Sequence, residues 1–189
     1  MDDKYFFWGP LLYQTKIRRF KTFLDHHNKD QSHNQKLAGI LDNQFTFDAD
    51  FFNDQISDIF KRYLNFYETY YNKHLQNKEY GLTGCWINFM KQGDFNPPHI
   101  HDGDFSCVLY LQVPEDLKKE NQAYVGTDKA GPGGIQFFYG EDRPHTINNI
   151  HIFPEEGDFF IFPANLRHVV YPFKSDCIRI SMSANFFLK

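Results

Sequence analysis

Cysteine is scarce in this chain of 189 residues, and its few cysteines form no pattern. The three are Cys85, Cys107 and Cys177. They are odd in number and widely spaced, and no Cys-x-x-Cys pair occurs. The sequence therefore indicates neither a disulfide framework nor a zinc knuckle, and we expect each thiol to behave as a small hydrophobic side chain.

Excess positive charge and long apolar runs are also missing. The net charge is -4, with 20 Lys and Arg against 24 Asp and Glu, whereas a nucleic-acid partner requires a basic face. No segment approaches the ~18 consecutive apolar residues of a membrane-spanning helix. The first residues lack the basic region and apolar core of a signal peptide. We therefore expect a reduced, cytoplasmic protein with neither a nucleic-acid partner nor a membrane partner.

Aromatic residues are in excess, with 22 Phe and 11 Tyr, and they suit buried elements better than solvated loops. From Phe52 to Tyr70 apolar side chains recur every three or four residues, which predicts a long amphipathic helix over about residues 50–75. A shorter helix is predicted over residues 15–27. The chain length suits one domain. We therefore predict a single domain over residues 1–189, with residues 1–83 as a helical N-terminal support.

From Gly84 onward the pattern changes to short β-prone segments separated by turn residues. No helix long enough for a crossover separates them, which favours an antiparallel sandwich or barrel over a parallel sheet. The polar stretch 115–133 is predicted to be a long loop of the kind that often forms a lid. The fold class is therefore mainly β with N-terminal helices. The predicted strands are residues 85–91, 105–113, 134–139, 149–152, 158–163 and 177–187.

Three of the nine histidines have a spacing that suits a metal ion. His99 and His101 form a His-x-His pair, and in a strand the side chains of residues i and i+2 point to the same side. His168 follows a distant strand-like segment and would complete the set. Imidazole binds iron, zinc, copper and nickel, so the ligands alone do not choose the metal. A His-x-His pair also occurs by chance, but here it directly follows Pro97-Pro98, at the mouth of a predicted strand.

Two motifs around these histidines resemble those of the cupin and 2-oxoglutarate oxygenase superfamily. The stretch Gly93-Asp-Phe-Asn-Pro-Pro-His99-Ile-His101 resembles the first cupin motif, although the glutamate that follows His-x-His in that motif is absent. The stretch from Gly157 to His168 resembles the second motif, with Asn165 in place of the usual glycine. The resemblance implies that residues 84–189 form a double-stranded β-helix, or jelly roll, and that the metal is Fe(II).

A third motif resembles the 2-oxoglutarate-dependent branch of the superfamily. Arg179-Ile-Ser181 begins eleven residues after His168, and in that branch an arginine or lysine near this position binds 2-oxoglutarate. The resemblance implies that Arg179 and Ser181 hold this cosubstrate. A guanidinium matches a carboxylate with two parallel hydrogen bonds, and an arginine in an apolar strand would be costly to bury without an anion. The alternative is that Arg179 pairs with a structural carboxylate or faces solvent.

The strand from Ser106 to Leu111 resembles the prolyl-hydroxylase strand that follows the iron-binding residues. In those enzymes, and in similar small bacterial and phage-type oxygenases, a tyrosine at the position of Tyr110 hydrogen-bonds the far carboxylate of 2-oxoglutarate. The resemblance therefore implies the same role for Tyr110. A core tyrosine that donates to a backbone carbonyl is the alternative.

One departure concerns the third metal ligand, because oxygenases of this kind usually present two histidines and one carboxylate. Here His101 occupies the carboxylate position. Either His99, His101 and His168 bind the iron together, or a bulge at Gly103 turns Asp104 to the metal and displaces His99. We favour three histidines because an i, i+2 pair needs no special geometry, and we expect Asp102 to face away.

The sequence therefore favours an Fe(II) enzyme that couples decarboxylation of 2-oxoglutarate, with O2, to hydroxylation of a small-molecule or peptidyl substrate. Two alternatives stay open: a cupin-type metal-dependent dioxygenase or isomerase without 2-oxoglutarate, and a non-catalytic jelly-roll binding module. Fold-level analogy does not identify the substrate.

Overall fold

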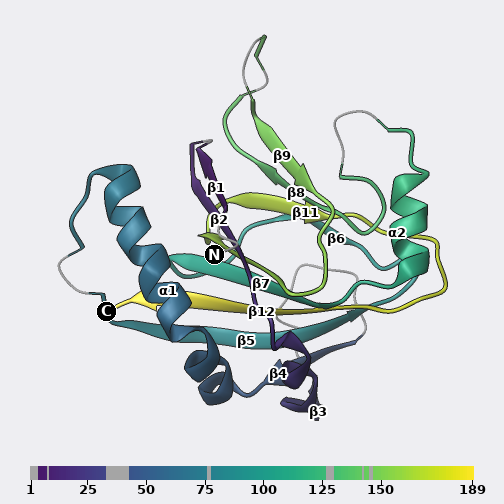
Figure 1. Ribbon diagram of the computed structural model, residues 1–189, viewed down its shortest axis with the longest axis horizontal. Helices are drawn as coiled ribbons and strands as arrows, with labels where there is room; N and C mark the ends of the chain where they lie inside the picture. Colours follow the sequence, from purple (N-terminus) through teal and green to yellow (C-terminus); the bar gives the residue numbers. More distant parts are fainter. Residues whose placement is uncertain are drawn as a thin grey trace.

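Two antiparallel sheets face each other, and one long helix covers the outer face of the larger sheet (Figure 1). The computed structural model describes residues 4–7, 9–32, 43–75, 78–126, 130–141, 143–144 and 147–189. The larger sheet has eight strands, which are, in spatial order, β1 (Lys4–Phe7), β2 (Leu11–Lys16), β10 (Asp158–Pro163), β7 (Phe105–Gln112), β12 (Arg179–Leu188), β5 (Tyr80–Met90), β4 (Gln44–Phe47) and β3 (His27–Ser32). The smaller sheet has four strands: β6 (Asn96–His99), β11 (Arg167–Val170), β8 (Ile135–Phe138) and β9 (Asn149–Ile152).

The central strands of the larger sheet are buried on both faces. In β7, Cys107 and Leu109 face the helix, whereas Val108 and Tyr110 face the smaller sheet, because successive strand residues point to opposite sides. The same alternation holds in β10 and β12. Since both faces are covered, β7 and β10 read as continuous apolar runs rather than as alternating ones. One hydrophobic core thus lies outside the larger sheet, and a second lies between the two sheets.

The helix that builds the outer core is α1 (Ala49–Tyr71), which confirms the helix predicted from the apolar spacing. Asp48 begins it, since its side chain accepts a hydrogen bond from the Phe51 amide. Asn72 ends it in the left-handed conformation. The predicted stripe packs against the sheet, and the Phe60 ring stacks on Phe186 of β12 with 4.2 Å between centroids. Helix α1 therefore supports the sheet from behind the site.

The prediction that residues 1–83 form a helical support is wrong in its first half. Residues 4–47 contribute β1 to β4, and only a short 3-10 helix (Phe20–Asp25) forms in the segment where a helix over residues 15–27 was predicted. Strand β2 pairs with β10, so that Tyr13 lies opposite Ile161 and is fully buried. Pairing of β2 with β1 on one side and β10 on the other outweighs the weak helical periodicity at the start of such a short segment. The sheet therefore extends well beyond residues 84–189.

The predicted loop 115–133 is also wrong in part. Its first half is α2 (Glu115–Gln122), anchored by the buried Leu117 and begun by two acidic residues that suit a helix N-terminus. None of the described residues of this stretch lines the cavity that contains the predicted site. In the described part of the chain, no helix is both long enough and apolar enough to cross a membrane.

Candidate metal and cosubstrate site

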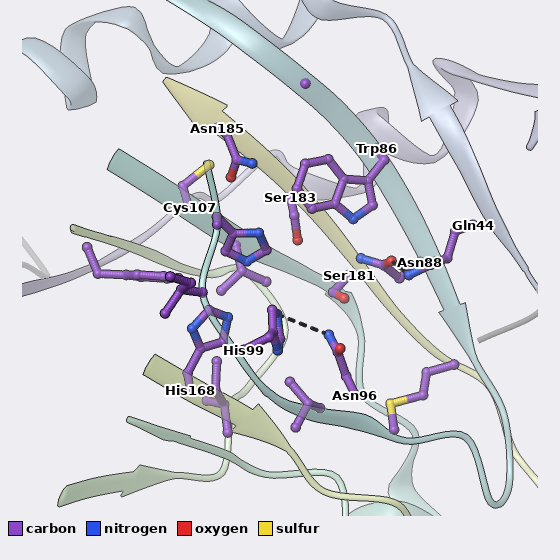
Figure 2. Close-up of a pocket in the computed structure, with 18 of the residues that line it drawn as sticks. Gln44, Trp86, Asn88, Asn96, His99, Cys107, His168, Ser181, Ser183 and Asn185 are labelled. Atoms are coloured by element: carbon purple, nitrogen blue, oxygen red, sulfur yellow. Dashed lines mark hydrogen bonds between the residues drawn. The ribbon is translucent and has the colours of Figure 1, made fainter. Parts of the chain in front are cut away.

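Three histidines converge at the mouth of the space between the sheets. His99 ends β6 and lies opposite His168 of the neighbouring β11, and His101 follows two residues later. The ring centroids are 4.3 Å apart for His99 and His168, 4.9 Å for His99 and His101, and 5.0 Å for His101 and His168. One ring nitrogen of each lies within 4.8 Å of the others. Figure 2 shows His99 and His168 directed into the same space.

The convergence agrees with the sequence prediction, but its geometric cause differs. Strand β6 stops at His99, so the i, i+2 alternation of a strand does not bring His101 to the cluster. Instead the His101 amide donates to the Ala164 carbonyl, 2.9 Å away, in the turn that precedes β11. Two features therefore bring the three histidines together: the strand pairing of His99 with His168, and the backbone hydrogen bond from His101 to Ala164.

Backbone carbonyls fix the orientation of two of the imidazoles. Nδ1 of His99 lies 2.7 Å from the Pro97 carbonyl, and Nδ1 of His168 lies 2.9 Å from the Leu166 carbonyl. A carbonyl oxygen only accepts, so each Nδ1 carries the proton and each Nε2 keeps its lone pair. Metal-binding histidines are held in this way by a partner on the other ring nitrogen.

Burial keeps the three imidazoles neutral. It lowers the pKa of His99, lowers that of His101 to about 3, and lowers that of His168 well below 6.5. The neighbouring imidazoles lower the pKa of His101 and His168 further. A metal ion requires neutral imidazole, so at pH 7 the cluster is already in the state that binds one.

These shifts predict that the metal-free protein loses stability as the pH falls below 6.5. Protons then bind the unfolded chain, whose histidines titrate near pH 6.5, but not the folded one. Each such histidine costs about 1.4 kcal/mol of unfolding free energy per pH unit, and for His101 this continues until the pH nears its folded pKa of about 3. Urea unfolding at pH 7, 6 and 5 gives the unfolding free energy at each pH. Plotted against pH, this free energy should change less steeply, by about that amount per pH unit, in His101→Gln than in the wild type. His151→Gln, at an exposed position, serves as the control for removal of a histidine. A pH dependence in His101→Gln equal to that of the wild type would contradict the expectation.

Asp104, the alternative ligand, lies elsewhere. Its Oδ2 accepts a hydrogen bond of 2.8 Å from the Leu188 amide at the end of β12. Gly103 does turn the chain, with φ of +94°, and a Cβ there would lie 2.6 Å from the Phe186 carbonyl oxygen. That turn directs Asp104 toward β12 rather than toward the histidines. Asp102, which was expected to face away, lines the cavity.

Arg179 is buried in the same cavity with few partners. Its side chain is 3% exposed, and its Nη1 donates to the Gly133 carbonyl at 2.8 Å. Its Nε is buried without a hydrogen-bond partner, and no carboxylate of the described residues forms an ion pair with it. The Tyr110 ring lies beneath the guanidinium, 5.3 Å from its carbon. Burial lowers the pKa of Arg179 from 12.5, yet the group stays cationic at neutral pH. Buried cations are normally paired with an anion, and Arg179 has none among the described residues.

Ser181 and Tyr110 lie beside Arg179 and offer two hydroxyls. They are register partners on β12 and β7, so their side chains point into the same space, and both are buried. Burial raises the pKa of Tyr110 to about 12, which keeps its hydroxyl protonated and able to donate. The predicted guanidinium and both predicted hydroxyls are thus brought together.

One cavity of about 310 Å³ connects the histidines with Arg179. Beside His168 its wall is apolar: Ile135, Phe162 and Val170 line it, and the Phe162 ring lies 5.1 Å from the imidazole. The Phe137 ring packs against the same imidazole at 5.7 Å. The opposite wall is polar, and its amide side chains were not predicted (Figure 2). It includes Gln44, Trp86, Asn88, Ser183 and Asn185, whereas Asn96 lies beside His99 on β6. The alternation of Trp86, Asn88 and Met90 along β5 was the available signal for three cavity-lining residues, but it requires knowing which face is covered.

Comparison with known proteins gives a family and a fold. The family of 2OG-Fe(II) oxygenases matches residues 84–185, more than half of the chain. No curated protein matches the chain. Among the solved structures that are similar, two cover 92% of this chain. The viral collagen prolyl hydroxylase from Paramecium bursaria Chlorella virus 1, in its 2OG complex, is 16% identical over 94% of its own length, with a TM-score of 0.56.

The second structure is a prolyl hydroxylase from Trichoplax adhaerens in complex with a hypoxia inducible factor peptide fragment. It is 14% identical to this chain over 83% of its own length, with a TM-score of 0.52. Likeness at such identity concerns the fold alone. It confirms the predicted fold class, a mainly β double-stranded β-helix.

Proposed function

The chain belongs to the 2OG-Fe(II) oxygenase family, and on that premise we propose that it hydroxylates a C–H bond of a small-molecule or peptidyl substrate. Fe(II) is its cofactor and 2-oxoglutarate its cosubstrate. When bound, they would supply the oxidation: 2-oxoglutarate would lose CO2 and take up one atom of O2 to become succinate, and the other oxygen atom would enter the C–H bond. The protein contributes binding, orientation and exclusion of water.

We assign the iron to His99, His101 and His168. The donor set fits, because three neutral imidazoles present nitrogens within 4.8 Å of one another, and backbone carbonyls hold two of the rings through Nδ1. The Nε2 of His99 accepts a hydrogen bond of 3.5 Å from Asn96 Nδ2, which a bound metal ion would replace. Three protein ligands would leave room on the metal for the cosubstrate and O2. The carboxylate alternative, Asp104, has its side chain engaged with the Leu188 amide.

We assign the far carboxylate of 2-oxoglutarate to Arg179, Ser181 and Tyr110. The guanidinium would bind the carboxylate oxygens through parallel charge-assisted hydrogen bonds, and the two hydroxyls would donate to the same group. The observation that carries the assignment is the buried Arg179 with an unsatisfied Nε and, among the described residues, no anionic partner, in the cavity that also contains the histidines. A dianionic cosubstrate supplies the missing charge. Phe137 and Phe162 would keep water away from the histidines.

Succinate formation tests the proposed function without knowledge of the substrate. Protein reconstituted with Fe(II) is expected to convert 2-oxoglutarate to succinate in the presence of O2, slowly and uncoupled, because the cosubstrate site is complete without substrate. Mass spectrometry or NMR detects the product. The matched control is the same protein loaded with Zn(II), which is not redox-active and should produce none. If the Fe(II) and Zn(II) samples produce the same background, the assignment fails.

A further inference from the structure

The cavity extends beyond the residues assigned to the metal and the cosubstrate. Along β12, Arg179, Ser181, Ser183 and Asn185 all line it. Asn185 lies four residues beyond Ser181, roughly 13 Å along a strand that rises about 3.3 Å per residue. This end of the cavity is available for a substrate, and the proposed function leaves it unassigned.

Asn185 is a buried amide with a fixed orientation. Its side chain is 9% exposed, and its Oδ1 accepts a hydrogen bond of 2.9 Å from Oγ of Ser106, the fully buried register partner on β7. Because the carbonyl oxygen is engaged on the far side, Nδ2 is the group left for the cavity. Among the described residues none accepts from this Nδ2. The pair therefore presents a neutral hydrogen-bond donor.

The space in front of Asn185 is open. Its register partner on β5 is Gly84, which also lines the cavity and has no side chain to fill it. A Cβ built on Gly84 would meet only the Trp86 ring, at 3.5 Å. Trp86 in turn lies beside the metal cluster, 5.7 Å from His101 between ring centroids. A ligand at Asn185 would therefore extend along the indole toward the histidines.

Charge decides which chemical group suits Asn185. Arg179 is the only Lys or Arg among the described residues that line the cavity, and Asp102 is their only carboxylate. An anion at Asn185 would lack a cation of its own, because the proposed cosubstrate neutralises Arg179, and it would share the cavity with Asp102. A neutral carbonyl oxygen accepts from Nδ2 without that cost.

We propose that Asn185 is a positioning residue for the substrate, and that its Nδ2 donates to the oxygen of an uncharged amide carbonyl while Trp86 contacts the carbon skeleton beside it. The inference rests on the proposed function, since it assigns the part of the cavity that the cosubstrate leaves open. The carbonyl belongs either to a peptide backbone or to a small carboxamide.

Ligand-observed NMR on the Zn(II)- and 2-oxoglutarate-loaded protein tests this, because that complex cannot turn over. The probes are simple alkyl carboxamides, the isosteric alkyl carboxylic acids, which contain no amide carbonyl, and blocked tripeptides. We expect the best amide to bind at least about tenfold more tightly than its acid. The amide gains one neutral hydrogen bond, whereas the acid loses the hydration of its charge. Tripeptides that bind more tightly than single amides assign the carbonyl to a peptide, and the reverse assigns it to a small carboxamide.

Two variants locate the effect at Asn185. Asn185→Asp replaces the donor by an acceptor of the same shape and should abolish the amide preference while 2-oxoglutarate affinity stays within about twofold. Asn88→Asp is the matched control: Asn88 is also an amide held through Oδ1, by Gln44 Nε2 at 2.6 Å, but it is the register partner of Ser181. It should alter 2-oxoglutarate affinity and keep the amide preference.

Three results would overturn the inference: no amide binds, acids bind as tightly as amides, or Asn185→Asp keeps the preference. The first two use the wild-type protein, so they hold even if the variant does not fold. In each case intact 2-oxoglutarate binding leaves the proposed function standing. Failure of 2-oxoglutarate to bind the wild type would instead remove the proposed function itself.

Discussion

Replacing Arg179 with methionine is expected to weaken 2-oxoglutarate binding by roughly 30- to 4000-fold. Loss of one partner of a buried, hydrogen-bonded charge pair costs about 2–5 kcal/mol, and about 1.4 kcal/mol is tenfold in affinity. Arg179 is the only described cation in the cavity, so no neighbour replaces it. Isothermal titration of the Zn(II)-loaded protein with 2-oxoglutarate measures the change.

The same variant is expected to unfold no more easily than the wild type when 2-oxoglutarate is absent. Within the described part of the chain, Arg179 makes one hydrogen bond, to Gly133, and contacts no anion. An apolar side chain of similar length should therefore leave the unfolding free energy unchanged or raise it by about 1 kcal/mol. Arg179→Lys keeps the positive charge but not the planar guanidinium. Its affinity for 2-oxoglutarate should therefore fall between that of the wild type and that of Arg179→Met. A protein that loses stability on Arg179→Met yet still binds 2-oxoglutarate would show that the arginine is structural.

Replacing His168 with glutamine is expected to lower the affinity for Fe(II), or for Zn(II) or Co(II) as mimics, by more than about 100-fold. Changes to residues that only orient a ligand already cost 10- to 100-fold, and the loss of a ligand itself should exceed that. His168 is the most buried histidine of the three, and its Nδ1 is held by the Leu166 carbonyl. Competition with a chromophoric chelator gives the affinity of wild type and variant.

Two further variants make this metal prediction specific. His151→Gln removes an exposed histidine of β9 and should not change the affinity. Asp104→Asn tests the alternative ligand set: it should retain the metal and lose only stability, because the Leu188 amide loses a charged acceptor. A loss of metal on Asp104→Asn as large as that on His168→Gln would restore the carboxylate as a ligand.

The site could be predicted from the sequence because its key residues belong to short motifs. Arg179 and Ser181 alternate along one strand, so their common orientation follows from the period of two. The pairing of His99 with His168 is different, because it depends on β6 lying beside β11, about 70 positions away in the sequence. Here the family resemblance supplied what local pattern could not.

The residues that the sequence did not predict depend on long-range pairing. The period of two along β12 places Asn185 on the same face as Arg179 and Ser181, but the hydrogen bond from Ser106 that orients its amide comes from another strand and could not be predicted. Strand β2 forms because residues 11–16 pair with β10, which lies far away in the sequence. Helix α2 has one buried apolar residue, Leu117, and therefore no periodic stripe to detect. In each case the deciding contact is not local.

The central claim is that one cavity holds both the metal, on three histidines, and 2-oxoglutarate, on Arg179. Anaerobic titration of the Fe(II)-loaded protein with 2-oxoglutarate tests it most directly, since the cosubstrate produces a weak visible charge-transfer band only when it binds the iron itself. We predict a saturable band for the wild type, none for His168→Gln, and for Arg179→Met a band that appears only at much higher 2-oxoglutarate concentrations. A wild-type protein that binds Fe(II) and 2-oxoglutarate without producing the band would contradict the account, because the two ligands would then lie in separate sites.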